Sequence, residues 1–193
     1  MSLFLFIYPM RNTILLIFSF FTLTSSLAQL KPGFEPKEYE EILGVYAHSI
    51  TDTSFSKGIP KPVTLKKAAE SPTVGLENKW YLWINEAEKR AIFSIRGTVP
   101  NPTSWLANFY SAMIPAKGEM KFRNDYTFNY CFSKDPKAYV HVGWTLATGA
   151  LAESLLPKME ELTQEGYRDF IITGHSQGGA ITYLMAAMLM EMN

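Results

Sequence analysis

Apolar and polar residues recur along the chain with spacings that predict alternating helices and strands. From Lys37 to Ile50 the apolar residues fall at the three- and four-residue spacing of one helix face. Two apolar runs follow, WYLWI at 80–84 and AIFSI at 91–95, and the polar segment NEAEKR separates them. They predict a strand, a turn and a second, buried strand. This second strand leads directly into Arg96-Gly97-Thr98.

The same alternation continues in the second half. After Pro102, the segment TSWLANFYSAM predicts a helix with one apolar face, formed by Trp105, Leu106, Phe109, Tyr110 and Met113. Residues 114–139 predict irregular structure, except for a half-buried aromatic strand at 126–132, for which an acyl-groove lining is the alternative interpretation. A long helical pattern runs from Gly143 to Gly166, and Pro157 predicts a kink or the start of a second helix. The strand RDFIIT and the helix AITYLMAAMLMEM complete the chain.

Strand, helix, strand and helix in this order predict an α/β fold with a mostly parallel central sheet flanked by helices. The last helix is apolar on nearly all sides, which predicts burial on all sides. The strand before it would also be left as an open sheet edge. We therefore expect residues 37–193 to be the N-terminal part of a domain that is truncated after this helix; a finished protein is the alternative.

The N-terminal residues have the composition of a targeting segment. Residues 1–28 contain Arg11, an apolar core and the small-residue end Ser26-Leu27-Ala28, which is typical of a secretory signal peptide cut after Ala28. The protein is then secreted or periplasmic. An uncleaved membrane anchor is the alternative, because the apolar span is long enough to cross a bilayer. Residues 29–36 predict a linker.

Composition excludes several classes of function. Lys+Arg and Asp+Glu are both 18, so the chain lacks the basic character of a nucleic-acid-binding protein. Cys131 is the only cysteine, so no intrachain disulfide can form, and a buried inert thiol is favoured over a nucleophile. The three histidines, His48, His141 and His175, are scattered and show no zinc-site spacing. We expect neither a metal nor an organic cofactor.

The sequence Gly174-His175-Ser176-Gln177-Gly178 lies between a strand and a helix, the setting of a nucleophile elbow. A serine there needs a strained backbone, and glycines two residues away on either side avoid a collision. The helix N-terminus, the backbone N–H of Gln177 and the amide and hydroxyl of Thr98 are candidates to stabilise an oxyanion. A phosphate-binding loop fits less well, because neither the dinucleotide-binding nor the Walker pattern is present.

Four segments occur in the order found in one family: IFSIRGT, TSWLANF, VHVGW at 140–144 and ITGHSQGGA. Together, over residues 37–192, they resemble the class 3 lipases, the fungal lipase-like α/β-hydrolases. The resemblance implies Ser176 as nucleophile, with Thr98 and Gln177 forming the oxyanion hole, and a structural His141. It also implies a lid beginning near Trp105, for which an ordinary amphipathic helix packed on the core is an equal alternative. Gln177 replaces the leucine usual in the family, and only its backbone is expected to matter.

A serine nucleophile needs a base and a group that orients the base. In α/β-hydrolases these follow the serine as Asp or Glu and then His, but after Ser176 this chain has only Glu191 and no histidine. The sequence thus predicts a secreted ester hydrolase acting on lipid or other acyl-ester substrates, with a lipid-interface contact at the lid. Because the triad is incomplete in this chain, the chain alone is expected to be unstable and to have little or no esterase activity. An inactive fragment, an exported binding protein with the same fold and an acyltransferase are the alternatives.

Overall fold

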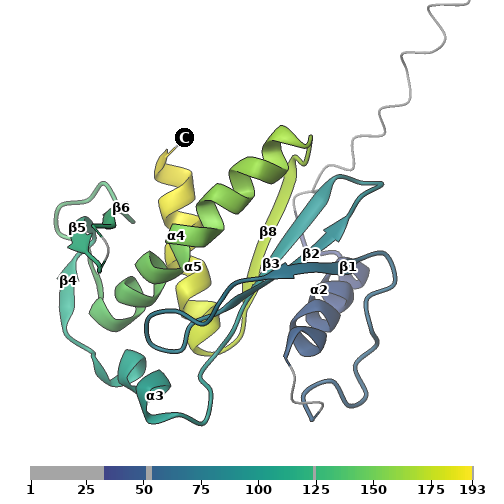
Figure 1. Ribbon diagram of the computed structural model, residues 1–193, viewed down its shortest axis with the longest axis horizontal. Coiled ribbons are helices and arrows are strands. Elements are labelled where there is room, and N and C mark those ends of the chain that lie inside the picture. Colours follow the sequence, from purple (N-terminus) through teal and green to yellow (C-terminus); the bar gives the residue numbers. More distant parts are fainter. Residues whose placement is uncertain (1–32, 51–53, 124, 193) are drawn as a thin grey trace, which may run out of the picture.

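The computed structural model describes residues 33–50, 54–123 and 125–192 (Figure 1). The predicted signal peptide and residues 29–32 of the predicted linker lie outside these residues. The elements, in chain order, are α2 (Pro36–Ser49), β1 (Lys66–Glu70), β2 (Trp80–Asn85), β3 (Arg90–Ile95), α3 (Pro102–Phe109), β4 (Met113–Pro115), β5 (Lys117–Lys121), β6 (Thr127–Cys131), β7 (Tyr139–His141), α4 (Val142–Gln164), β8 (Asp169–Gly174) and α5 (Gln177–Met192).

A four-stranded sheet in the order β1-β2-β3-β8 forms the centre of the described chain. β3 and β8 are parallel, whereas β1 with β2 and β2 with β3 are antiparallel. The α/β class is confirmed, but the described sheet is mixed rather than mostly parallel. The reason is the short turn at residues 86–89, which returns the chain beside β2 and permits only antiparallel pairing.

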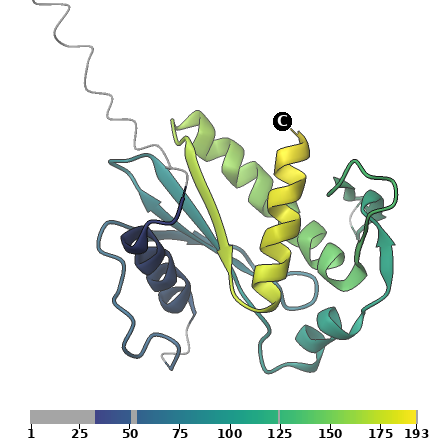
Figure 2. The ribbon, with the colours of Figure 1, turned by 180° about the vertical axis from the view of Figure 1, so that it is seen from behind.

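Helices cover both faces of this sheet: α2 lies on one face, and α4 and α5 lie on the other (Figures 1 and 2). Alternate side chains of β3 serve the two faces, as expected for a strand buried on both sides. Phe93 and Ile95 join the larger core against α4 and α5. Ile92 joins the smaller core with Val45 of α2. This arrangement explains why apolar residues occur on both sides of β3, with Ser94 as the one buried polar residue among them.

The structure differs from the sequence prediction in the segment between α3 and α4. Residues 114–139 are not mainly irregular: β4 pairs with β7, and β5 pairs with β6. The predicted aromatic strand is β6, where Phe128 and Tyr130 are buried. β1 was also not predicted, because its sequence KKAAE is polar and lies at an exposed sheet edge.

The structure bears on three further expectations. α4 is one continuous helix that contains Pro157, so no second helix begins there, and packing of Leu155 and Leu162 in the core offsets the roughly 3 kcal/mol that an interior proline costs. Tyr183 and Met190 of α5 are exposed among the described residues, so burial of this helix on all sides stays a prediction. Cys131 is only partly buried, and its thiol contacts the carbonyl of Ser133 at 3.5 Å.

No helix among the described residues is long and apolar enough to span a membrane.

Candidate active site

The parallel register of β3 and β8 brings the two predicted site segments together. Ile95, the last residue of β3, lies opposite Gly174, the last residue of β8. Arg96-Gly97-Thr98 and His175-Ser176 therefore leave the same edge of the sheet side by side. Strand carboxyl ends are where α/β folds place their functional residues.

Close backbone contacts explain the glycines of this edge. A Cβ on Gly178 would lie 2.3 Å from the Ile95 carbonyl oxygen, and one on Gly174 would lie 2.5 Å from the Gly178 carbonyl carbon. A Cβ on Gly97 would lie 2.8 Å from the carbonyl oxygen of His175. Such contacts leave no room for any side chain, so glycine is required for the elbow and the Arg-Gly-Thr turn to approach each other.

Ser176 has the strained backbone that the elbow motif predicts. Its φ is +55°, in the left-handed region that residues other than glycine seldom adopt, and its side chain is exposed. α5 begins at the next residue, Gln177. The first N–H groups of a helix have no partner within it and carry partial positive charge. The arrangement therefore presents a hydroxyl and backbone donors at one exposed point.

The side chain of Thr98 is held by helix α3. Asn108 Nδ2 donates to Thr98 Oγ1 at 3.0 Å. The following residue, Val99, donates its N–H to the hydroxyl of the buried Ser104 at 3.1 Å. Two hydrogen bonds thus fix the Arg-Gly-Thr turn to α3.

The Gln177 side chain is buried and connects the elbow to the same helix. Only 3% of it is exposed, and its Nε2 donates to Ser104 O at 3.2 Å and to Asn108 Oδ1 at 3.1 Å. The sequence interpretation gave this residue a backbone role alone. The structure adds a side-chain role that the replacement of leucine by glutamine could have indicated.

His141 is part of the scaffold beneath this network. Its Nδ1 accepts from the Trp144 N–H, and its Nε2 is 3.3 Å from the Asn108 carbonyl oxygen. Because the amide only donates and the carbonyl only accepts, the imidazole is the neutral form with its proton on Nε2. The ring also stacks on Trp144, with centroids 4.2 Å apart. Both nitrogens are used, so His141 has the structural place that the resemblance implied.

The other two histidines face α2 or the loop after it. His48 Nε2 is 3.0 Å from the carbonyl oxygen of Ile59. The exposed His175 ring lies 5.6 Å from the Tyr46 ring, centroid to centroid. Burial, and secondarily Tyr81, raises the pKa of Tyr46, so its phenol stays protonated at neutral pH. All three histidines of the sequence are thus described, and each has neighbours other than Ser176.

A cavity of about 320 Å³ lies next to the elbow, between α2 and the end of β8. Its lining is mainly apolar and includes Leu43, Tyr46, Phe55 and His175. The cavity therefore borders the backbone that carries Ser176, on the face of the sheet that α2 covers.

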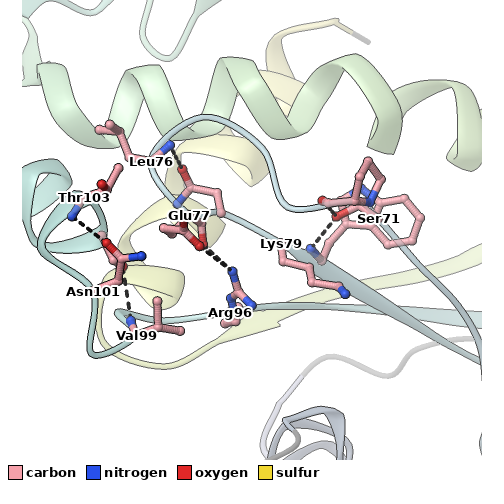
Figure 3. A network of polar contacts seen from close by, with 12 residues as sticks. Ser71, Leu76, Glu77, Lys79, Arg96, Val99, Asn101 and Thr103 are labelled. Carbon is pink, nitrogen blue, oxygen red and sulfur yellow. Dashed lines mark hydrogen bonds and ion pairs between the residues drawn. The ribbon is translucent and has the colours of Figure 1, made fainter.

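Arg96 ties the Arg-Gly-Thr turn to the loop between β1 and β2 (Figure 3). Its Nη2 donates to the Glu77 carbonyl oxygen at 2.6 Å and lies 3.8 Å from Glu77 Oε2. On the far side of the turn, Asn101 caps α3 by accepting from the Thr103 N–H at 2.9 Å. The segment that holds Thr98 is therefore anchored at both ends.

α3 presents its large apolar side chains outward. Ser104 and Ala107 are fully buried, whereas the exposed fractions are 49% for Trp105, 51% for Leu106 and 72% for Phe109. The predicted apolar face therefore does not pack on the core. The small residues face inward because α4 begins against them: a Cβ on Gly143 would lie 2.1 Å from the Ala107 carbonyl oxygen.

Within the described residues no group of His, Cys, Asp and Glu side chains is arranged to hold a metal ion. The residues at this edge instead offer a hydroxyl, backbone N–H groups and side-chain amides.

The family model of the class 3 lipases matches residues 92–193, just over half of the sequence. The chain belongs to the class 3 lipase family. The matched residues include both the Arg-Gly-Thr turn and the elbow, so the two segments that β3 and β8 bring together are part of the class 3 lipase match.

Solved lipase structures share the fold. A fungal lipase–inhibitor complex superposes with a TM-score of 0.57 at 18% identity, over 81% of this chain and 56% of that one. The triacylglyceride lipase of Rhizomucor miehei has a TM-score of 0.53 at 17% identity, with the same two coverages. The Lip2 lipase of Yarrowia lipolytica gives 0.52 at 17% identity, again over 81% and 56%. The chain thus spans little more than half the length of these lipases. No curated protein matches the sequence.

Proposed function

We propose that this protein is a secreted serine ester hydrolase that acts on acyl esters of lipids. The observation that carries the proposal is the placement of Ser176, exposed and at positive φ, beside the Arg-Gly-Thr turn through the pairing of Ile95 with Gly174. A strained serine at a helix N-terminus fits acyl transfer chemistry and has no evident structural purpose.

In the proposed reaction the Ser176 hydroxyl attacks the carbonyl carbon of the ester. The carbonyl oxygen becomes an oxyanion, which accepts hydrogen bonds from the Gln177 N–H and from the amide and hydroxyl of Thr98. The base takes the proton of the Ser176 hydroxyl and passes it to the departing alcohol as the ester C–O bond breaks. Water, deprotonated by the same base, then attacks the acyl group, which leaves as a carboxylic acid while Ser176 regains its proton. Transfer of the acyl group to a second alcohol would use the same residues.

The base and its acidic partner are, in this proposal, an aspartate and a histidine that follow Asn193. Support comes from the placement of the histidines that the sequence does contain: His141 is committed to Trp144 and Asn108, His48 contacts Ile59, and His175 faces Tyr46. The reading frame past Asn193 is expected to encode an aspartate and then a histidine.

Two further features belong to the proposal. Residues 1–28 act as an export signal, for which the charge and small-residue pattern is the support. The exposed side chains of Trp105, Leu106 and Phe109 contact a lipid surface, since an uncharged apolar patch of this kind favours such an interface.

The test is hydrolysis of p-nitrophenyl butyrate by the full-length protein. Ser176→Ala is expected to lower kcat by at least about 1000-fold, the scale of losing a catalytic nucleophile. Ser111→Ala, at an exposed serine after α3, is the matched control and is expected to retain full activity. Equal activity of the two variants would refute the role of Ser176. Absence of hydrolysis in the unsubstituted protein would favour an exported binding protein, which the lack of a base near Ser176 in the described chain supports.

A further inference from the structure

Gln177 contributes more to this site than its backbone N–H. We propose that its side chain is a positioning residue that clamps α3 to the elbow, so that the oxyanion hole is formed before any substrate or lipid surface is met. This inference rests on the proposed roles of Ser176 and Thr98. It assigns α3 as a fixed wall of the site, in place of the opening lid that the sequence suggested.

The direction of each hydrogen bond in the clamp is set by the groups at its two ends, which can play only one role. The Ser104 carbonyl oxygen can only accept, so the Gln177 amide nitrogen must face it. Trp144 Nε1 can only donate, and it lies 3.3 Å from Asn108 Oδ1. The Asn108 oxygen therefore accepts from both Trp144 and Gln177, and this side chain cannot turn over without opposing donors to donors.

This orientation determines what Thr98 can do. Because Asn108 Oδ1 faces Trp144 and Gln177, Asn108 Nδ2 must donate to Thr98 Oγ1, as the 3.0 Å distance shows. The Thr98 hydroxyl then acts as the acceptor in this bond. Its own proton stays available for an oxygen on the substrate, which is the polarity that an oxyanion requires.

The clamp also restrains α3 mechanically. If α3 swung outward, the buried amide nitrogen of Gln177 would lose both acceptors, and its Oε1 is already buried without a partner in the described structure. An unpaired buried donor is unfavourable. The far end of α3 is also bonded to α4, through the N–H of Gly143 and the carbonyl oxygen of Tyr110 at 3.1 Å. Both ends of the helix are thus held.

Amide hydrogen exchange on the full-length protein, with and without phosphatidylcholine vesicles, tests the fixed wall without any substitution. Exchange of the amides at 105–110 is expected to accelerate by less than about twofold when vesicles are added, because hydrogen-bonded backbone exchanges only through opening. An acceleration of tenfold or more on vesicle addition would show an opening lid and overturn the proposal.

Two variants then test the clamp itself. Gln177→Leu removes the donors, and Gln177→Glu places a carboxylate against two acceptors, Ser104 O and Asn108 Oδ1. We expect amide exchange at 105–110 to be about tenfold faster in Gln177→Leu, which loses both hydrogen bonds to α3. Exchange should be faster still in Gln177→Glu, because a carboxylate also repels the two acceptor oxygens. The control is Gln164→Leu, at an exposed glutamine that ends α4, which should leave this exchange unchanged. Unchanged exchange in both Gln177 variants would overturn the clamp.

Kinetics separate positioning from mere packing. With p-nitrophenyl butyrate, Gln177→Leu is expected to lower kcat by about tenfold with KM within twofold, because the oxyanion is bound only in the transition state. A tenfold increase in KM with an unaltered kcat would contradict the positioning role. If the unsubstituted protein hydrolyses nothing, the proposed function fails, while the exchange measurements still decide the clamp.

Discussion

Ile95 of β3 and Gly174 of β8 lie opposite each other at the last position of a parallel strand pair. The pairing places a threonine turn beside a serine elbow, although the two segments are far apart in the sequence. Gly97, Gly174 and Gly178 permit the contact, because a Cβ at any of them would collide with backbone atoms. The site therefore depends on strand register and glycine placement before any polar contact forms.

The close approach of Gly178 to Ile95 predicts a strong effect of a small substitution. Gly178→Ala is expected to lower the free energy of unfolding by about 1–3 kcal/mol, because the new methyl group overpacks against the strand. Gly179→Ala is the matched control: its Cβ would meet only Gly174 backbone atoms, the nearest at 3.3 Å. Urea denaturation of the two variants measures the difference. Equal stabilities would show that the elbow can accommodate a methyl group at position 178 without a clash.

The hydroxyl of Thr98 is expected to act separately from its amide. Thr98→Val keeps the backbone N–H and the shape but loses the hydroxyl proton, so kcat for p-nitrophenyl butyrate should fall by about 10- to 100-fold. Thr98→Ser keeps the hydroxyl and should retain most of the activity. If Thr98→Val is as active as Thr98→Ser, the hydroxyl does not contact the oxyanion.

His141 is expected to matter for stability and not for proton transfer. His141→Ala removes the acceptor of the Trp144 N–H and the donor to Asn108 O, so the free energy of unfolding should fall by about 1–3 kcal/mol. The pH dependence of the remaining kcat should keep its shape. Loss of the acidic limb of that pH profile in a folded variant would instead identify His141 as a base.

Trp105 offers an optical test of the lipid contact. Trp80 and Trp83 are 4% and 2% exposed, whereas Trp105 is 49% exposed, so transfer of its indole into lipid should shift the emission to shorter wavelength. The shift is expected on addition of phosphatidylcholine vesicles and should disappear in Trp105→Phe. An unchanged spectrum in the unsubstituted protein would argue against contact through α3.

Glu70 provides a pH effect remote from the site. Hydrogen bonds from Lys67 first and Lys79 second lower its pKa to about 2 from the ordinary 4.5. Because the folded pKa is the lower one, the contribution to stability is complete above about pH 4.5 and is lost as the pH falls through 2. Glu70 is on an exposed edge, so this contribution should be below about 1 kcal/mol.

The measurement for Glu70 is the difference in urea midpoint between pH 6 and pH 2. Glu70→Gln should show a smaller difference than the unsubstituted protein. Glu160→Gln, at an exposed position of α4, is the matched control and should show the original difference. Identical differences in all three proteins would mean that the Glu70 ion pairs do not stabilise the fold.

Sequence patterns predicted the elements with strong apolar periodicity and missed those stabilised by context. β3, β8, α2 and α5 were predicted because burial against the core dictates their composition. β1 was missed because an exposed edge strand needs few apolar residues. β4 and β7 were missed because they are three residues long and pair with each other, and β5 was missed because its residues are mostly polar and exposed. The mixed direction of the sheet follows from the short turn between β2 and β3, which makes these strands antiparallel. The apolar pattern alone did not predict this pairing.

The candidate site shows the same division. Ser176, Thr98 and Gln177 were identified because the elbow and the strand end have local signatures, and the structure places them at one edge of the sheet. Their catalytic roles remain predictions. Asn108 was not identified, because it lies within a helical pattern whose inner face could not be told from its outer face. Only the three-dimensional contacts to Thr98, Trp144 and Gln177 reveal its place.

The central claim is that Ser176 is the nucleophile, and covalent labelling tests it most directly. The full-length protein would be treated with an alkyl fluorophosphonate and the modified residue located by peptide mass spectrometry. We expect one phosphonyl group on the peptide that contains Ser176, formed at least about 10-fold more slowly in Thr98→Val, because the oxyanion donors also stabilise the phosphoryl oxygen. Labelling elsewhere, or equal labelling of Ser176→Ala, would contradict it.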